Sequence, residues 1–200
     1  MAVVTERKRP TQEQRTDAMR ARLLEATLEL IAEEGWAQTS TQKICKRADV
    51  SRGAQTHHFP TKDSLLIAAV QEIVARYQRE LDAVSDQNHS RVQTLEDLFD
   101  FLWDACFEGN LLNSWMEVMV AARTDEALRP AVIETDSTAI EAMRSLGAKC
   151  HPSASHPGAS AADLVELTVY LLRGMVVQSG VHPDKKVRQR LFGLWKKLVI

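Results

Sequence analysis

The sequence predicts an all-α protein of about nine helices. Apolar residues recur at spacings of three and four along most of the 200 residues, which is the period of an amphipathic helix. No segment shows the alternation of a half-buried strand, and no Asn-Gly dipeptide marks a hairpin. Eight Gly and six Pro are too few for a loop-rich β-sandwich or a disordered chain. These observations together favour a helical protein with a substantial core.

The first two expected helices lie close together near the N-terminus. An amphipathic helix over 16–34 ends at Gly35, because glycine is the usual residue just beyond a helix. Ser40 or Thr41 then caps a short helix, since a side-chain oxygen there accepts a free backbone N–H. We expect the chain to turn at Asp49, immediately after this second helix.

A third short helix is expected over 52–59, directly after the turn. Ser51 is its capping residue, and Pro60 ends it because proline lacks the backbone N–H that a helix interior needs. Two short helices joined by a tight turn and preceded by a longer one are typical of a helix-turn-helix, whose second short helix can enter a major groove.

The rest of the chain predicts longer and more apolar helices. Thr61 caps the first of them, which looks like a connector between two domains. Pro130 predicts a kink in the first part of its helix, and the Pro- and Gly-containing stretch 151–160 predicts a mobile surface loop. The expected helices here are 62–84, 92–109, 111–122, 125–147, 161–179 and 184–199.

The charge is unevenly distributed along the chain. The net charge is -2, yet residues 1–62 carry a balance of +3 and the remainder a balance of -5. The basic end of the chain comes first, which is compatible with a nucleic-acid partner. Residues 7–9 form a short basic arm, either a soluble tail or an extension that contacts phosphates.

Cysteine usage and hydropathy indicate a cytoplasmic protein. The three cysteines are widely spaced and form no C-x-x-C pair, so we interpret them as reduced thiols. No segment approaches the roughly 20 apolar residues that span a bilayer, and the N-terminus lacks a signal-peptide pattern. We therefore expect a protein that is neither exported nor embedded in a membrane.

A set of residues at fixed spacing follows a known pattern: Gly35-Trp36-Ala37-Gln38-Thr39-Ser40, Ile44, Ala48, Val50-Ser51, Gly53, His58-Phe59-Pro60, Lys62 and Leu65-Leu66. Through these residues the helix-turn-helix region resembles the tetracycline-repressor (TetR) family over about residues 17–66. The chain departs from the family pattern at Cys45, where Ala is usual, at Asp49, where the turn Gly is usual, and at Thr56, where Tyr is usual. Asp tolerates the left-handed backbone of such a turn, but the Thr hydroxyl reaches less far toward a phosphate.

The resemblance implies three parts: a flexible basic arm over 1–14, a helix-turn-helix domain over 15–62, and an effector-binding and dimerisation domain over 63–200. The implied partners are double-stranded operator DNA, a second copy of the chain and a lipophilic small molecule, with no cofactor, metal or membrane. The implied activity is repression that ends when the small molecule binds.

The DNA contacts are assigned by matching the family motif. The N-terminus of the second helix should meet a phosphate, because a helix start offers free N–H groups, and Lys62 should hold another phosphate. Gln42 and Arg52 suit adenine and guanine edges, while Gly53 and Ala54 let the backbone approach the groove. The expected DNA-binding residues are Ser40, Thr41, Gln42, Arg52, Gly53, Ala54, Thr56, His57, His58 and Lys62.

Two adjacent histidines leave an alternative open. His57 and His58 point about 100° apart on a helix, so one should pack and the other should face outward. His58 stands at the family position, where a backbone or phosphate contact is implied, while His57 could read or brace the groove. Alternatively both cap the small core beside Phe59. Gln55 could likewise be no more than a solvated residue.

Bulky apolar residues predict a ligand pocket in the larger domain. Aromatic and sulfur-containing side chains gather on two consecutive helices and offer a large, adaptable apolar surface. Arg123 and Asp136 could orient a ligand, and a packed core without a cavity is the alternative. The expected ligand-binding residues are Phe99, Trp103, Cys106, Phe107, Trp115, Met116, Met119 and Arg123.

The last two helices predict a dimer interface. The helix over 161–179 is apolar around much of its circumference, which one small bundle cannot fully bury, unless both helices form the central core of a monomer. The expected interface residues are Leu164, Leu167, Leu171, Met175, Leu191, Leu194, Trp195 and Leu198.

Other functions have little support in the sequence. Cys150, His151 and His156 supply too few positioned groups for a nucleophile with its base or for a zinc site, and Cys106 lies on an apolar helix face. We therefore expect no enzyme activity. A DNA-binding regulator without a small-molecule effector, either an activator or a protein controlled by a partner, remains the alternative.

Overall fold

The computed structural model describes residues 11–85, 92–107, 111–150 and 158–200. Helices account for most of these residues, and no strand occurs in the described part of the chain. The helices are α1 (Gln12–Glu34), α2 (Thr41–Ala48), α3 (Arg52–His58), α4 (Lys62–Ser85), α5 (Leu95–Phe107), α6 (Leu111–Ala122), α7 (Arg129–Cys150), α8 (Ala161–Ser179) and α9 (Lys185–Val199). The expected all-α architecture is confirmed.

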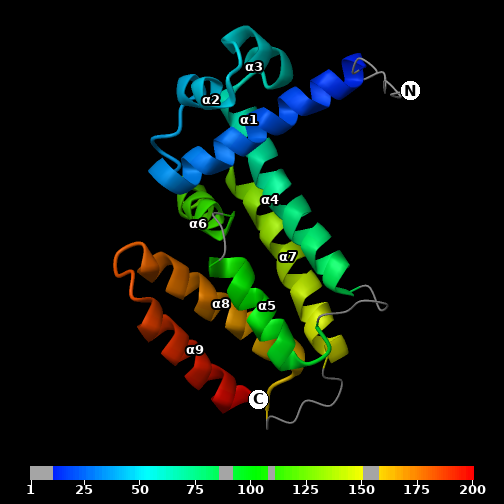
Figure 1. Cartoon of the computed structure of the whole chain (residues 1–200), viewed down its shortest axis with the longest axis vertical. Coiled ribbons are helices and arrows are strands. Elements are labelled where there is room, and N and C mark those ends of the chain that lie inside the picture. The colour runs from blue at the N-terminus through cyan, green and yellow to red at the C-terminus, as the bar shows by residue number, and fades with distance from the viewer. Residues whose placement is uncertain (1–10, 86–91, 108–110, 151–157) are drawn as a thin grey trace, which may run out of the picture.

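Figure 1 shows two regions stacked along the long axis of the molecule. Helices α1, α2 and α3 form one end, and α5, α8 and α9 form the other. The long helices α4 and α7 run side by side between them, with α6 beneath α1. A change in α4 or α6 can therefore reach both ends of the molecule.

Local capping fixes the N-terminal helices. Helix α1 begins four residues before the expected Thr16, because Thr11 and Gln14 form a reciprocal capping box at 3.2 and 2.9 Å. The last residues of the predicted arm are therefore helical, and 1–10 lie outside the described residues. Asp49 ends α2 with a φ of 52°, which is the left-handed backbone expected of it.

Both ends of α7 differ from the prediction, and α5 begins at Leu95 instead of 92. Helix α7 begins at Arg129 instead of 125, because the Asp125 carboxylate accepts the backbone N–H groups of Ala127 and Leu128 at 3.0 Å and holds a turn. Pro130 therefore lies in the first turn of α7, where its missing N–H removes no helical hydrogen bond, and a kink is not required. The helix continues to Cys150, and 151–157 lie outside the described residues.

Two apolar cores stabilise the fold. One joins α1–α3 to α4 and α6, and the other fills the bundle of α5, α7, α8 and α9. All three cysteine thiols are free. The side chains of four apolar residues of α4 lie outside the described ones: Val74, Tyr77, Leu81 and Val84.

Helix α8 corrects the expectation that no segment is long enough to span a membrane. The segment Ala161–Val181 has the length and the mean hydropathy of a membrane span. Several of its side chains are nevertheless buried within the protein, among them Val165 and Leu172, which are fully buried. The high hydropathy of α8 is therefore explained by its place in the second core.

Candidate nucleic-acid interface and ligand cavity

Helices α2 and α3 lie at the outer end of the small domain, which is formed by α1, α2 and α3 (Figure 1). Gln42, Arg52 and Gly53 are exposed, whereas Thr41 and Ala54 are half-buried. The Ser40 hydroxyl accepts the Lys43 backbone N–H at 3.3 Å. Its oxygen is therefore already engaged as a cap, which leaves the exposed residues as the better candidates for base contacts.

Salt bridges to α1 hold α2 in place. Arg47 binds Glu33 at 2.6 Å and Glu29 at 3.2 Å, and Lys43 binds Glu34 at 2.5 Å. The two carboxylates raise the pKa of the Arg47 guanidinium further above its ordinary value. Because acidic side chains of α1 neutralise Arg47 and Lys43, we assign these two cations to positioning α2 and not to contacting DNA.

A buried glutamine fixes the end of α3. Gln55 is only 3% exposed, and its side-chain amide donates to the Phe59 carbonyl at 2.6 Å. The alternative that Gln55 is merely solvated is therefore wrong. The Phe59 ring is itself buried, with the Arg20 guanidinium 4.6 Å above its centre. This contact anchors α3 to α1, which no short-range pattern in the sequence could indicate.

The remaining α3 residues divide between solvent and the domain. His57 is exposed and His58 is half-buried, and their rings meet edge-on at 5.3 Å. The Thr56 hydroxyl donates to the Arg52 carbonyl at 2.9 Å, one turn back in the same helix. Lys62 is half-buried at the start of α4, and the reciprocal Thr61–Ser64 cap supports that helix start.

An apolar cavity lies between α5, α6, α7 and α8. It leaves about 40 Å³ in which the centre of a water-sized molecule can move, within about 600 Å³ of space between atoms that also counts open solvent. Helices α5 and α6 contribute Phe101, Leu102, Ala105, Cys106, Leu112 and Trp115. Burial raises the pKa of the Cys106 thiol to about 12, so this side chain is uncharged at neutral pH.

Cys106 and Trp115 therefore line the cavity as predicted, whereas the other predicted ligand-binding residues do not. Trp103 lies four residues before Phe107, so both occupy one face of α5, and that face meets Phe192 of α9. Phe99 is fully buried in the bundle core. The cavity instead faces the adjacent side of α5, which carries Phe101, Leu102, Ala105 and Cys106.

The predicted residues of α6 and its C-terminal end also point elsewhere. Met116 and Met119 pack against the core shared with α1, and Arg123 is exposed beyond the end of α6. A count of bulky residues could not separate the cavity face of α6 from the face that joins the small domain. That separation depends on how α6 lies between two cores.

Helices α7 and α8 supply cavity residues that the sequence did not identify. They are Thr135, Ala139, Met143, Val169, Leu172 and Arg173, with Ile73 added from α4. Asp136, expected to orient a ligand, forms a paired salt bridge with Arg173 at 2.5 and 3.3 Å. The available signal was a single arginine within the otherwise apolar run of α8.

The outer face of α8 and α9 is apolar and exposed. Among the predicted interface residues, Leu167, Leu194 and Leu198 are 51%, 50% and 62% exposed. Leu191 is also exposed, and Leu171, Met175 and Trp195 are half-buried. Leu164 is a correction, because it is buried in the core of its own subunit.

Trp195 connects the two helices. Its indole N–H donates to the Thr168 hydroxyl at 2.9 Å, and Thr168 is fully buried. Trp195 therefore holds α9 against α8 within one subunit, while the neighbouring leucines face outward.

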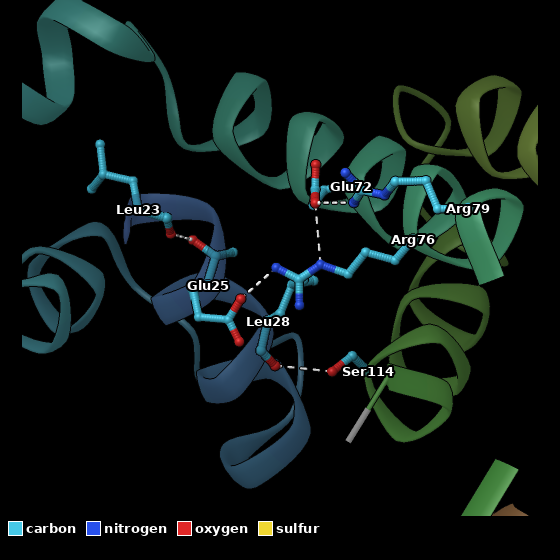
Figure 2. Close-up of polar contacts among 8 residues, drawn as sticks. Leu23, Glu25, Leu28, Glu72, Arg76, Arg79 and Ser114 are labelled. Atoms are coloured by element: carbon cyan, nitrogen blue, oxygen red, sulfur yellow. Dashed lines mark hydrogen bonds and ion pairs between the residues drawn. The ribbon is translucent and has the colours of Figure 1, made fainter. Parts of the chain in front are cut away.

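Helix α6 joins the cavity region to the small domain (Figure 2). The Ser114 hydroxyl is buried and donates to the Leu28 carbonyl of α1 at 2.9 Å. The Glu117 carboxylate accepts the Trp36 backbone N–H at 3.3 Å. The same carboxylate leaves no room for a side chain at position 35, because a Cβ atom added to Gly35 would lie 2.9 Å from it. The φ angle of Gly35 is 83°, which also favours glycine.

An ionic contact adds α4 to this junction. Arg76 lies between Glu25 of α1 and Glu72 of α4 and pairs with both, and Arg79 also reaches Glu72 (Figure 2). The two carboxylates raise the pKa of Arg76, which keeps it charged. Helix α1 therefore contacts both α4 and α6, two helices that also line the cavity.

Residues 23–69 match a family model described as bacterial regulatory proteins, tetR family. The chain is 31% identical to the HTH-type transcriptional regulator CymR of Pseudomonas putida, over 92% of this chain and 90% of that protein. An uncharacterised HTH-type regulator of Mycobacterium tuberculosis is also 31% identical, over 90% of this chain and 92% of that protein. A TetR-family member from Streptomyces coelicolor shares the fold, with a TM-score of 0.65 at 21% identity over 91% of this chain and 98% of that one.

Proposed function

Because the chain belongs to the tetR family of bacterial regulatory proteins, it is a DNA-binding transcriptional regulator, and we propose that it is a homodimeric repressor released from its operator by a small apolar molecule. The family is not enzymatic. The observation that carries the proposal is that α6 lines the apolar cavity on one face and holds α1 on another. A regulator of this kind acts on chromosomal DNA, so we place it in the cytoplasm.

The exposed starts of α2 and α3 support the assignment of DNA contacts. Arg52 and Gln42 present a guanidinium and an amide to solvent, which suit guanine and adenine edges in the major groove. Lys62 and the α2 N-terminus then contact the phosphates. Thr56 contributes less than the family motif implies, because its hydroxyl already donates to the Arg52 carbonyl of its own helix. The Ser40 hydroxyl accepts the Lys43 N–H and keeps its own proton for a phosphate.

The apolar face of α8 and α9 supports dimerisation. Its leucines remain exposed after the bundle has formed, and a contiguous apolar surface of this kind is typical of an interface. Two copies joined there would present two α3 helices to successive major grooves, which requires a separation of about 34 Å.

The coupling step runs through α6. Leu112 and Trp115 line the cavity, and the intervening Ser114 binds the Leu28 carbonyl of α1. A ligand that favours a shifted α6 therefore favours a shifted α1, which carries α2 and α3 with it. The equilibrium moves only as far as the ligand prefers one arrangement over the other.

The test is operator binding by the purified full chain at several salt concentrations, with DNA from the region upstream of its own gene. We expect affinity to fall steeply with salt, and apolar compounds that raise the Tm to weaken operator binding at the same time. Compounds that raise the Tm without changing operator affinity would favour a regulator without a small-molecule effector. Protein that binds no duplex at low salt would contradict the proposal outright.

A further inference from the structure

Arg173 is an unusual member of the cavity lining. Of the described residues that line the cavity it alone is charged, and it is only 8% exposed. It lies on α8 among apolar neighbours, including Leu172, which lines the same cavity. A buried guanidinium needs partners for its N–H groups, so each of its donors has to be accounted for.

One nitrogen atom of the Arg173 guanidinium has no partner in the described part of the protein. The two terminal nitrogens face Asp136 on α7 at 2.5 and 3.3 Å, which satisfies one end of the guanidinium. The Nε atom is buried and forms no hydrogen bond in the described part of the protein. Buried N–H groups are rarely left in this state, which points to an acceptor supplied by a bound molecule.

The salt bridge decides what kind of acceptor fits. Asp136 already balances the charge of Arg173, so the pair presents a hydrogen-bond donor without an excess of positive charge. A ligand with a carboxylate would enter an apolar cavity that offers it no free counter-ion, and the burial of an unbalanced charge is costly. An ammonium group would find the Asp136 carboxylate occupied.

We propose that the cavity binds a small, mostly apolar molecule whose uncharged oxygen, such as a carbonyl or ether, accepts the Arg173 Nε–H, and that Asp136 excludes carboxylates. This inference rests on the proposed function only in identifying the bound molecule with the effector. Cys106, with its raised pKa, stays an uncharged part of the lining and takes no covalent part in binding.

Three probes of nearly equal shape test the proposal: 2-acetylnaphthalene, the hydrocarbon 2-isopropenylnaphthalene and 2-naphthoate. Calorimetric titration of the full-length protein at pH 7.5 should rank the ketone first, by about tenfold over the hydrocarbon, because only the ketone pairs the buried donor. Naphthoate should bind most weakly. Equal affinity for ketone and hydrocarbon, tightest binding of naphthoate, or no binding of any probe would overturn the proposal.

Two variants identify the groups responsible. Asp136→Asn keeps the shape of the side chain but leaves Arg173 unbalanced, so naphthoate should gain about tenfold and overtake the ketone. Glu166→Gln is the matched control, because Glu166 pairs with Arg144 and is not among the residues that line this cavity. The ranking of the three probes should not change in this variant. A naphthoate affinity that stayed weakest in Asp136→Asn would reject the role given to Asp136.

A double variant guards against misfolding. Arg173→Met combined with Asp136→Asn removes both charges, so neither is left buried alone. Its helical circular dichroism and urea midpoint report folding, and the ketone should lose its advantage over the hydrocarbon while both still bind. Persistence of that advantage would place the acceptor contact elsewhere.

The failure of this inference is distinguishable from failure of the proposed function. Probe binding is measured without DNA, whereas release is measured by adding the same ketone to the protein–operator complex. Ketone binding without operator release would contradict the effector role alone. Operator release by compounds whose affinity is the same in the Arg173 and Asp136 variants as in the unaltered protein would contradict the inference alone.

Discussion

The two ends of the molecule differ in how much apolar surface and how many buried polar groups the chain satisfies by its own packing. In α1–α3, buried polar groups such as the Gln55 amide have partners within the domain, and charged side chains of α2 are paired with α1. In the C-terminal bundle, a cavity remains open beside Arg173, and leucines of α8 and α9 remain exposed.

This difference follows from what each region does. The small domain must hold exposed residues such as Arg52 at fixed spacing, so its own side chains complete its structure. In the function proposed above, the bundle accepts a ligand and a second subunit, and for that purpose it has to leave part of its apolar surface unburied. Vacant apolar surface is therefore a better guide to the partners of the bundle than its exposed polar residues are.

The largest expected effect tests the exposed face of the bundle. Leu194→Glu places a charge among the apolar residues of α8 and α9 and should dissociate the dimer. Operator affinity should fall by about a hundredfold or more, because the two half-sites are then bound separately. Sedimentation velocity and gel-shift titration measure the two effects.

Val120→Glu is the control for this variant. Val120 is 58% exposed, but it lies on α6, away from the proposed interface. It should leave the dimer intact. If Leu194→Glu also remained dimeric and bound the operator normally, α9 would not form the interface.

The second prediction concerns the polar surface of the small domain. Arg52→Ala should weaken binding of the correct operator by about 1–3 kcal/mol and relax specificity at one base pair. Lys62→Ala should instead weaken binding on all sequences and reduce its salt dependence. Competition titrations against scrambled duplexes separate the two effects, and Lys185→Ala on α9 serves as a distant control. Loss of affinity without loss of specificity in Arg52→Ala would assign that residue to a phosphate.

The sequence predicted the small domain well because its structure depends on local rules. Capping residues, the turn at Asp49 and the proline after Phe59 each act within a few residues of their position. The exception is Gln55, whose burial no capping or turn pattern in the sequence indicates. Helix periods likewise placed α6, α8 and α9 within a residue of their observed bounds.

The cavity was harder to predict because it depends on how four helices are rotated about their axes. Trp103 and Phe107 were plausible pocket residues, yet a rotation of α5 turns them toward α9 and turns Cys106 inward. Arg173 lies in α8, the helix whose apolar character the sequence analysis attributes to a dimer interface. A charge within an apolar helix is the sequence signal that identifies such a site most directly.

A smaller effect is expected at the junction between the two regions. Ser114→Ala removes the hydroxyl that α6 donates to the Leu28 carbonyl, which should destabilise the protein by about 1 kcal/mol. It should also reduce the change in operator affinity that a bound ligand produces. Urea unfolding and ligand-dependent gel shifts measure these effects, with exposed Ser145→Ala of α7 as the control. Unchanged ligand response with reduced stability would restrict Ser114 to a structural role.

The smallest effect is expected in α3, where the test is whether a longer side chain at position 56 adds a contact to a DNA phosphate. Thr56 is exposed and bonds only to its own helix, so Thr56→Tyr extends a phenol toward the phosphate that the shorter side chain cannot reach. Operator binding should tighten by about 0.5–1 kcal/mol, the net value of one hydrogen bond. Thr56→Phe supplies the ring without the hydroxyl and should gain nothing. Equal gains in the two variants would mean that the ring packs against the DNA backbone, and that Thr56 costs this chain no phosphate contact.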